Sequence, residues 1–274
     1  MELCIAMQVA FPVLEELYIM YMHNLTMIWN DEFQADSLKV LKVEHSNELL
    51  KIFSTKMLRG VFQNLEELVV KNCDSVEEVF DDLRIAIAPA QSRTSELRTL
   101  ELDNLPNLKH VWKWNIEDPI TTVFFAKLGS IVVWNCRSLK TLFPTSIARN
   151  LQGLQVLNIN DCSGLEEVFL KEETAEAPPK FVFPRMKSLN LWRLKQLKSF
   201  YSGIHNLECP VLQKLVIINC ERLKIFYLEA EEDMQSSTNV ESQLTLQHHQ
   251  PLFSFSEVCR FGPFTVSFYV HFNH

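Results

Sequence analysis

The chain has 274 residues, of which 47% are hydrophobic and 22% are charged, and its formal net charge is -8. This length and composition allow one large globular domain or two small ones, each with a substantial buried core. The 26 basic residues are scattered singly, which argues against nucleic acid and anionic membranes as partners, because both bind to clustered lysine and arginine.

An octapeptide that occurs twice reveals an internal repeat. Residues 73–80 read CDSVEEVF, and residues 162–169 read CSGLEEVF. Extending the alignment outward gives eight copies of the register L-x-x-L-x-[ILV]-x-x-[C/L/other]-x-x-[LV]-x-x-[ILVF]-[FWY]. Their first apolar positions fall at residues 14, 38, 65, 97, 128, 154, 186 and 212, so the spacing varies from 24 to 32 residues. Spacings of this length indicate a leucine-rich-repeat solenoid that is loosened by insertions.

Each copy predicts one short strand followed by a turn. The L-x-[ILV] pattern has period two, which places both apolar side chains on one face of a strand, and the later apolar positions, three apart, favour a turn or a 3₁₀ segment. Stacked in parallel about 4.8 Å apart, the copies bury one continuous apolar column. We therefore expect an α/β leucine-rich-repeat solenoid with strands on its concave face, a mostly irregular or 3₁₀ convex side and few helices. In chain order, the expected strands cover residues 16–20, 40–44, 67–71, 99–103, 130–134, 156–160, 188–192 and 214–218.

The repeat register ends at Tyr227, which divides the chain into three parts. Residues 1–227 are expected to form the solenoid. Residues 228–250 are acidic and polar and are expected to be a disordered linker. Residues 251–274 are rich in aromatics but match no copy, and two interpretations of this tail stay open: it adds an edge strand, or it covers the last repeat poorly.

The cysteines and glutamates of the repeated octapeptide suggest a site at first, but the register indicates otherwise. Cysteine recurs at one position in four copies, where leucine and methionine also stand, so this position is predicted to be an inward apolar slot. The paired glutamates, including Glu77 and Glu78, lie between inward positions and are expected to face water. The alternative is a hydrolase that uses Cys73 or Cys162, and it predicts thiols that react with alkylating reagents in the folded protein.

The sequence contains no motif for a metal site, a phosphate-binding loop or a hydrolase. The seven cysteines contain no C-x-x-C pair, the eight histidines show no metal-ligand spacing, and G-x-S-x-G, H-E-x-x-H and phosphate-loop motifs are missing. We predict no enzymatic activity, no metal and no cofactor. No run of about 18 apolar residues occurs, and Glu2 stands where a signal peptide would carry a basic residue, so the expected location is the cytoplasm.

Candidate functional residues lie at the strand positions that alternate with the inward ones. Trp134 and Trp192 share one register position, and exposed tryptophans suit a protein-binding hot spot. The alternative is that loops or a neighbouring domain cover them. The candidate protein-binding residues of the concave face are Tyr18, Glu44, Lys71, Glu101, Asp103, Trp134, Asn158, Asn160 and Trp192.

Several segments resemble the C-terminal leucine-rich repeats of plant intracellular nucleotide-binding disease-resistance proteins of the coiled-coil class. They are VAFPVLEELYI (9–19), NLTMIWNDE (24–32), LPNLKHVWKWNIEDP (105–119) and VFPRMKSLNLWRLKQLKSFY (182–201). The resemblance covers residues 9 to about 227. Cysteine-containing repeats also occur in F-box proteins, which leaves the substrate-binding domain of an F-box ubiquitin ligase, or a general repeat scaffold, as alternatives.

The resemblance implies a role in protein recognition. In that family the repeat domain packs on the nucleotide-binding domain to hold the receptor inactive, and it helps to recognise pathogen effectors or the host proteins that they modify. The implied partners are therefore an effector, a guarded host protein or a nucleotide-binding domain. This chain has no phosphate loop, no kinase-2-like acidic strand and no coiled-coil heptads, so nucleotide binding is not carried over. It looks like a fragment or truncated relative that begins inside a repeat array.

Overall fold

The structure is a computed structural model, and it describes residues 10–29, 35–53, 64–80, 94–113, 125–170, 180–202 and 205–223, together with the backbone of 269–271. The expected linker 228–250 and most of the tail 251–274 lie outside the described residues.

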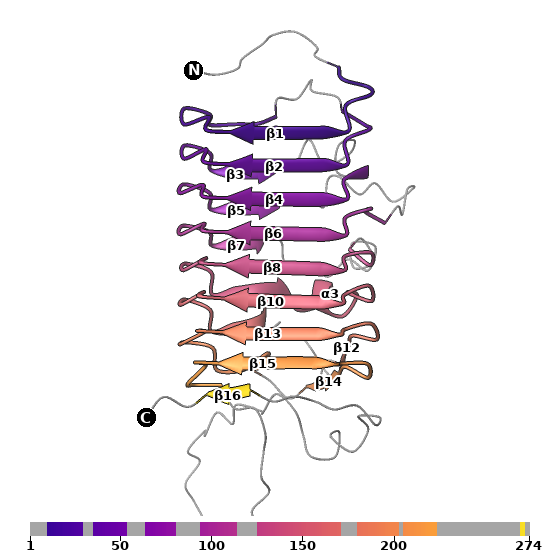
Figure 1. Cartoon of the computed structure of the whole chain (residues 1–274), viewed down its shortest axis with the longest axis vertical. Coiled ribbons are helices and arrows are strands. Elements are labelled where there is room, and N and C mark those ends of the chain that lie inside the picture. Colours follow the sequence, from indigo (N-terminus) through magenta and orange to yellow (C-terminus); the bar gives the residue numbers. More distant parts are fainter. Residues whose placement is uncertain are drawn as a thin grey trace, which may run out of the picture.

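A parallel sheet of nine strands runs the length of the molecule (Figure 1). Eight of these strands begin and end at the residues that the repeat register predicts. They are β1 (Glu16–Met20), β2 (Val40–Glu44), β4 (Glu67–Lys71), β6 (Thr99–Asp103), β8 (Ser130–Trp134), β10 (Val156–Asn160), β13 (Ser188–Trp192) and β15 (Lys214–Ile218). The ninth strand, β16 (Tyr269–His271), belongs to the tail and pairs with β15, so the tail adds an edge strand.

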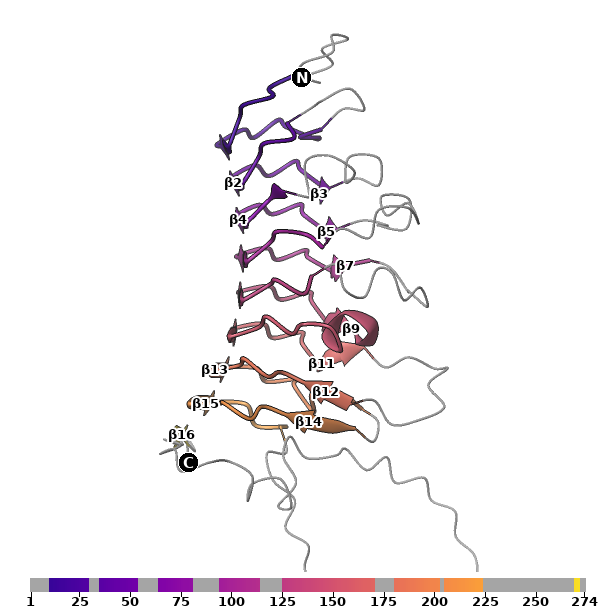
Figure 2. The same cartoon turned by 90° about the vertical axis from the view of Figure 1, so that its right-hand side faces the viewer.

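The long strands pair without stagger. Glu16 of β1 lies opposite Val40 of β2, and Val40 lies opposite Glu67 of β4, and the same correspondence continues to β15. Equivalent positions of all eight copies therefore form straight rows along the solenoid. Views from the side show that the long strands line the inner side of a gentle curve (Figure 2).

A second layer of short strands lies on the opposite side of each coil, where the sequence predicted turns or 3₁₀ segments. Five of these strands lie at the ends of the second to sixth copies, where two consecutive buried side chains face the core, and the unstaggered main sheet brings them beside their counterparts in adjacent copies. The other two, at residues 180–182 and 206–208, precede the long strands of the seventh and eighth copies. The fold class is confirmed, with this local difference. The short strands are β3 (Lys51–Phe53), β5 (Glu78–Phe80), β7 (His110–Trp112), β9 (Thr141–Pro144), β11 (Glu167–Leu170), β12 (Lys180–Val182) and β14 (Asn206–Glu208).

Helix is scarce in the described residues. The helix α3 (Thr145–Ala148) spans a single turn directly after β9. Nowhere in the described ranges is there a helix of the length and apolar character that crossing a bilayer requires.

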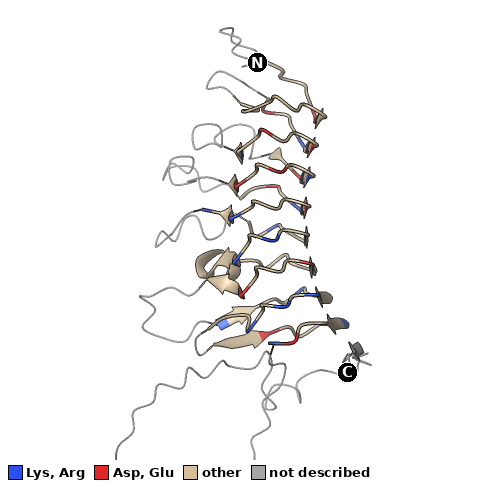
Figure 3. Ribbon diagram, turned by 90° about the vertical axis from the view of Figure 1, so that its left-hand side faces the viewer, with Lys and Arg blue, Asp and Glu red and all other residues tan. Residues whose placement is uncertain are grey.

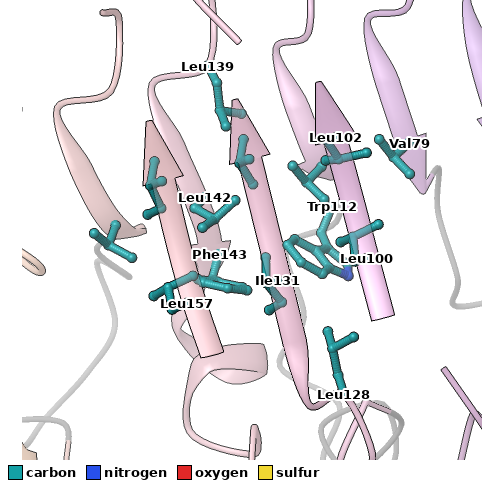
Figure 4. Close-up of a cluster of buried hydrophobic side chains, with 14 of the residues drawn as sticks. Val79, Leu100, Leu102, Trp112, Leu128, Ile131, Leu139, Leu142, Phe143 and Leu157 are labelled. Carbon is teal, nitrogen blue, oxygen red and sulfur yellow. The ribbon is translucent and has the colours of Figure 1, made fainter. Parts of the chain in front are cut away.

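The core is the space between the two layers, and an aromatic row runs through it. Ring centroids of successive members lie 5.0 to 6.0 Å apart, so the rings are in contact from one copy to the next. Figure 4 shows Trp112 beside Phe143, with Leu100, Ile131 and Leu157 of successive long strands around them. The row consists of Trp29, Phe53, Phe80, Trp112, Phe143, Phe169 and Phe200.

A left-handed residue follows each long strand and turns the chain toward the second layer. Asparagine occupies four of these eight positions, because its short polar side chain tolerates positive φ better than other non-glycine residues. The backbone N–H of this residue donates to the next copy, as from Asn104 to the carbonyl of Trp134 at 3.0 Å. The turn therefore links neighbouring repeats. The eight residues, with φ between 52° and 57°, are Tyr21, His45, Asn72, Asn104, Asn135, Asp161, Arg193 and Asn219.

Candidate protein-binding face

The first, third and fifth residues of the eight long strands point away from the core and form what we call the strand face. The second and fourth residues point inward, and from β2 to β13 they are fully buried. The outward residues are half-buried or exposed, with Val69 as the exception at 3% exposure. All nine candidate residues from the sequence lie on this face, at third or fifth positions of their strands.

The strand face is charged over β1 to β6, and we call this part the charged segment. Both acidic and basic residues lie along these strands (Figure 3). Lys42 pairs with Glu67 at 2.9 Å, and the hydrogen bond to this carboxylate raises the pKa of Lys42. The segment consists of Glu16, Tyr18, Met20, Val40, Lys42, Glu44, Glu67, Val69, Lys71, Thr99, Glu101 and Asp103.

Several candidate residues of the charged segment already have partners on the same face. Lys71 pairs with Glu101 at 2.7 Å. The Tyr18 hydroxyl donates to the Glu16 carboxylate at 2.9 Å, and this hydrogen bond raises the pKa of Tyr18. A protein that binds here has to displace or cover these contacts, which reduces the net gain from each charge.

From β8 to β15 the strand face changes character, and we call this part the uncharged segment. Lys214 is its one charged side chain, at the far end of the array. The rest are amides, hydroxyls, β-branched residues and two indoles. The segment consists of Ser130, Val132, Trp134, Val156, Asn158, Asn160, Ser188, Asn190, Trp192, Lys214, Val216 and Ile218.

Two exposed indoles flank an amide at the centre of the uncharged segment. Trp134 and Trp192 are 40% and 41% exposed, so within this chain neither indole is covered. Asn160 lies opposite Trp134 on one side and opposite Trp192 on the other. The guanidinium of Arg193 lies 5.3 Å from the centroid of the Trp192 ring and also reaches Asp161 at 3.4 Å. Arg193, held by Asp161, thus packs against the Trp192 indole.

The structure gathers four candidates, Trp134, Asn158, Asn160 and Trp192, into one continuous patch. The other five lie on the same face but within the ion-paired charged segment. The sequence-based choice missed Asn190, which lies directly opposite Asn158 and donates to Ser188 at 3.1 Å. Its register position equals that of Asn158, so the repeat alignment contained the signal.

Three of the four recurrent cysteines are core residues, and the fourth, Cys220, is partly buried against the core. Cys73, Cys136 and Cys162 are fully buried, and their thiols lie 3.2 to 3.4 Å from the carbonyl of the residue two positions earlier. Burial raises the pKa of Cys73, and the neighbouring Cys162 thiol together with burial raises the pKa of Cys136 well above 9.0. Within the described ranges no group of histidine, cysteine and acidic residues is arranged to hold a metal ion.

Glu78 differs from the sequence-based expectation that it faces water. It is 7% exposed and lies between two lysines of the neighbouring copies. Its carboxylate is 3.0 Å from Lys51 Nζ and 2.6 Å from Lys113 Nζ. Glu77 behaves as expected: it is only half-buried, and its hydrogen bond to Lys109 lowers the pKa of its carboxyl. The acid pair thus links adjacent repeats through ion pairs.

The buried thiols lead to a testable prediction. Iodoacetamide is expected to leave Cys73, Cys136 and Cys162 unlabelled in the folded protein and to label all three in urea, as measured by peptide mass spectrometry. A hydrolase that uses Cys73 or Cys162 requires fast labelling of that residue in the folded state, and this result would contradict the core assignment.

The raised thiol pKa values also give a pH dependence with a definite sign. A thiol whose pKa is higher in the folded state stabilises the fold below its unfolded pKa and loses this contribution as the pH rises through the folded value. For Cys220, burial raises the pKa to about 11. The free energy of unfolding should therefore fall between about pH 9 and pH 11, in part through this residue, and Cys220→Ala should reduce that fall.

Comparison with known proteins agrees with the repeat geometry. The family model described as "Plant disease resistance protein RPS2-like, leucine-rich repeats" matches residues 13–163 and 151–242. A relative from Arabidopsis thaliana, "Probable disease resistance protein At4g27220", is 30% identical over 137 residues, which are 48% of this chain and 14% of the relative. The matched part of that relative is therefore a small share of its length. Because the family model covers most of the chain, this protein belongs to the leucine-rich-repeat family of RPS2-like plant disease resistance proteins.

Proposed function

We propose that this chain is the protein-recognition module of a plant innate immune receptor. It acts in the cytoplasm and without catalysis, and it binds a pathogen effector, a host protein or an autoinhibitory partner domain through the strand face. The observation that carries the proposal is the pair of exposed indoles, Trp134 and Trp192, on either side of Asn160. Membership of the disease resistance family supports the role in defence.

The uncharged segment is the part of the face where binding costs least. A partner that covers it removes mainly apolar, hydroxyl and amide groups from water, whereas the charged segment holds ion pairs whose desolvation offsets much of the gain. Tryptophan supplies a large, rigid contact area, and residues of this kind dominate the energetics of interfaces. We therefore place the centre of the interface over β8, β10 and β13.

The charged segment lies beside this centre and would contact the edge of the partner's binding surface. Its outward side chains include five acids and two lysines, Lys42 and Lys71. Its excess of negative charge favours a partner with a basic surface beside an apolar or aromatic one, because complementary charges at the rim speed association and fix orientation. The uncharged segment thus supplies most of the binding energy, and the acidic charged segment selects and orients the partner.

Introducing a negative charge into the uncharged segment tests whether the interface is centred there. We expect Asn190→Glu to abolish partner recovery when the tagged chain is immunoprecipitated from plant tissue and quantified by mass spectrometry. The reason is that the interface would bury an unpaired carboxylate. Thr99→Glu introduces the same charge at a half-buried position of the same sheet, but within the charged segment, and should leave recovery nearly unchanged.

Two outcomes would contradict the proposal. Loss of partner with Thr99→Glu and retention with Asn190→Glu would move the interface to the N-terminal strands. Unchanged recovery with both variants would remove the strand face as the binding surface. Circular dichroism of each variant confirms that the comparison is made between folded proteins.

A further inference from the structure

The two exposed tryptophans of the strand face have different surroundings. Trp192 packs against the guanidinium of Arg193, which lies 5.3 Å from the ring centroid. The same guanidinium reaches the carboxylate of Asp161, in the preceding copy, at 3.4 Å. This arrangement combines a cation–π contact with an ion pair, and a planar guanidinium is the cation best suited to making both. The protein therefore contains one complete set of an indole, a carboxylate and a guanidinium.

Trp134 has a carboxylate beside it but no guanidinium. Asp103 of β6 lies directly opposite Trp134 of β8, one strand spacing or about 4.8 Å away. The residue that follows Trp134 is Asn135, whereas Arg193 follows Trp192. Within the described residues no lysine or arginine packs against the Trp134 ring, which is 40% exposed. The fifth copy thus has two of the three groups that meet at Trp192.

The Asp103 carboxylate can accept a cation from outside the chain. It is half-buried, and the hydrogen bond that it accepts from Asn135 Nδ2 is long, at 3.5 Å. Lys71 stands on the other side of Asp103, but its ammonium pairs with Glu101 at 2.7 Å. In the part of the chain that the structure describes, Asp103 makes no ion pair. A half-buried carboxylate that lacks a cation gains more from one than a carboxylate that is already paired.

An amide lies on the opposite side of Trp134. Asn160 of β10 is directly opposite Trp134, and its Oδ1 is buried without a hydrogen-bond partner among the described residues. The χ2 angle of asparagine is broadly populated, so rotation of the amide presents this oxygen to a donor above the sheet. A guanidinium carries five N–H donors, which is more than one carboxylate uses. Acceptors therefore stand on both sides of the exposed indole.

We propose that Asp103, Trp134 and Asn160 form a recognition site for one arginine side chain of the partner protein. The guanidinium packs on the indole, pairs with the carboxylate and donates to the amide. A cation–π contact extends to about 6 Å from the ring centroid, which exceeds the strand spacing, so one guanidinium reaches both the indole and the carboxylate. The acidic excess of the charged segment, which ends at Asp103, attracts a basic side chain to this place. This inference rests on the proposed function and names the chemistry that the strand face selects.

Titration of the full chain with two peptides tests the site. The probes are acetyl-Gly-Ser-Arg-Ser-Gly-amide and the same peptide with citrulline, which has nearly the shape of arginine but no charge. Binding is followed by NMR through the indole N–H signals of the isotope-labelled protein, and the signals of Trp134 and Trp192 are assigned by replacing each with phenylalanine. We expect the arginine peptide to shift the Trp134 signal and to bind roughly tenfold more tightly than the citrulline peptide.

Two variants separate this site from the acidic surface in general. Asp103→Asn removes the charge with little change of shape, and it is expected to abolish the preference for arginine over citrulline. Glu44→Gln removes a charge at the same register position two strands earlier, and it should leave the preference nearly unchanged. Equal affinity of the parent for the two peptides, or equal loss of the preference in both variants, overturns the inference.

Partner recovery distinguishes a failure of this inference from a failure of the proposed function. If the two peptides bind equally while Asn190→Glu abolishes partner recovery, the strand face is the interface and the arginine site is wrong. If the preference for arginine depends on Asp103 while Asn190→Glu retains the partner, the arginine site is supported and the proposed function is wrong.

Discussion

Replacing Phe80 with alanine is expected to lower the free energy of unfolding by about 3–5 kcal/mol. Phe80 is fully buried in the interior of the aromatic row. Its ring lies 5.6 Å from Phe53, 5.8 Å from Trp112 and 5.5 Å from Phe125, measured between centroids. Alanine leaves a cavity that the two neighbouring copies cannot fill, because the paired short strands β3, β5 and β7 hold their spacing.

Urea unfolding followed by circular dichroism measures this loss. Each repeat contacts only its neighbours, so a lesion in the third copy is also expected to broaden the transition as the N-terminal copies separate from the rest. Phe11→Ala is the control, because this phenylalanine is 45% exposed, and its removal should cost less than about 1 kcal/mol. Equal effects of the two substitutions would contradict the continuous core.

Replacing both exposed tryptophans with alanine is the second large effect that we expect. Hot-spot residues contribute at least about 2 kcal/mol each to binding, so the double variant Trp134→Ala and Trp192→Ala should weaken partner binding on the order of 1,000-fold. Stability should change little, because both indoles are about two-fifths exposed and neither belongs to the apolar core cluster.

The control for this pair is the double variant Leu50→Ala and Leu170→Ala. These leucines are 54% and 42% exposed, but they lie beside β3 and in β11, in the second layer away from the strand face. Calorimetric titration with a recombinant partner should give parent-like affinity for the leucine variant. Parent-like affinity of the tryptophan variant, with the fold intact, would remove the indoles from the interface.

The long strands were predictable because their signal is local. Five consecutive residues with alternating apolar positions define each strand, and the eight-fold alignment places its ends without ambiguity. The bounds of the long strands follow from this pattern alone and do not depend on how neighbouring strands pair. The same alternation identifies the outward residues, so the sequence alone places the candidate residues on the strand face.

The short strands and the burial of Glu78 were not predictable in the same way. Three residues such as those of β5 carry too little pattern to separate a strand from a turn. Their pairing depends on the distance to the adjacent copy, which the main sheet sets. Glu78 occupies a variable register position, and it is buried because Lys51 and Lys113 approach it from the copies before and after.

The division of the strand face into two segments also depends on three-dimensional neighbours. The charges of β2, β4 and β6 look like scattered surface residues in the sequence. Lys42 and Glu67 become partners only because β2 and β4 pair without stagger. Trp134 and Trp192, in contrast, were recognised from their shared register position, and the structure adds Asn160 between them.

Hydroxyl-radical footprinting of the chain with and without its bound partner tests the central claim most directly. If the partner binds the uncharged segment, the oxidation of Trp134 and Trp192 should fall on binding, while the oxidation of Leu50 and Leu170 stays unchanged. Protection of the two leucines with unchanged oxidation of both tryptophans would contradict recognition through the strand face.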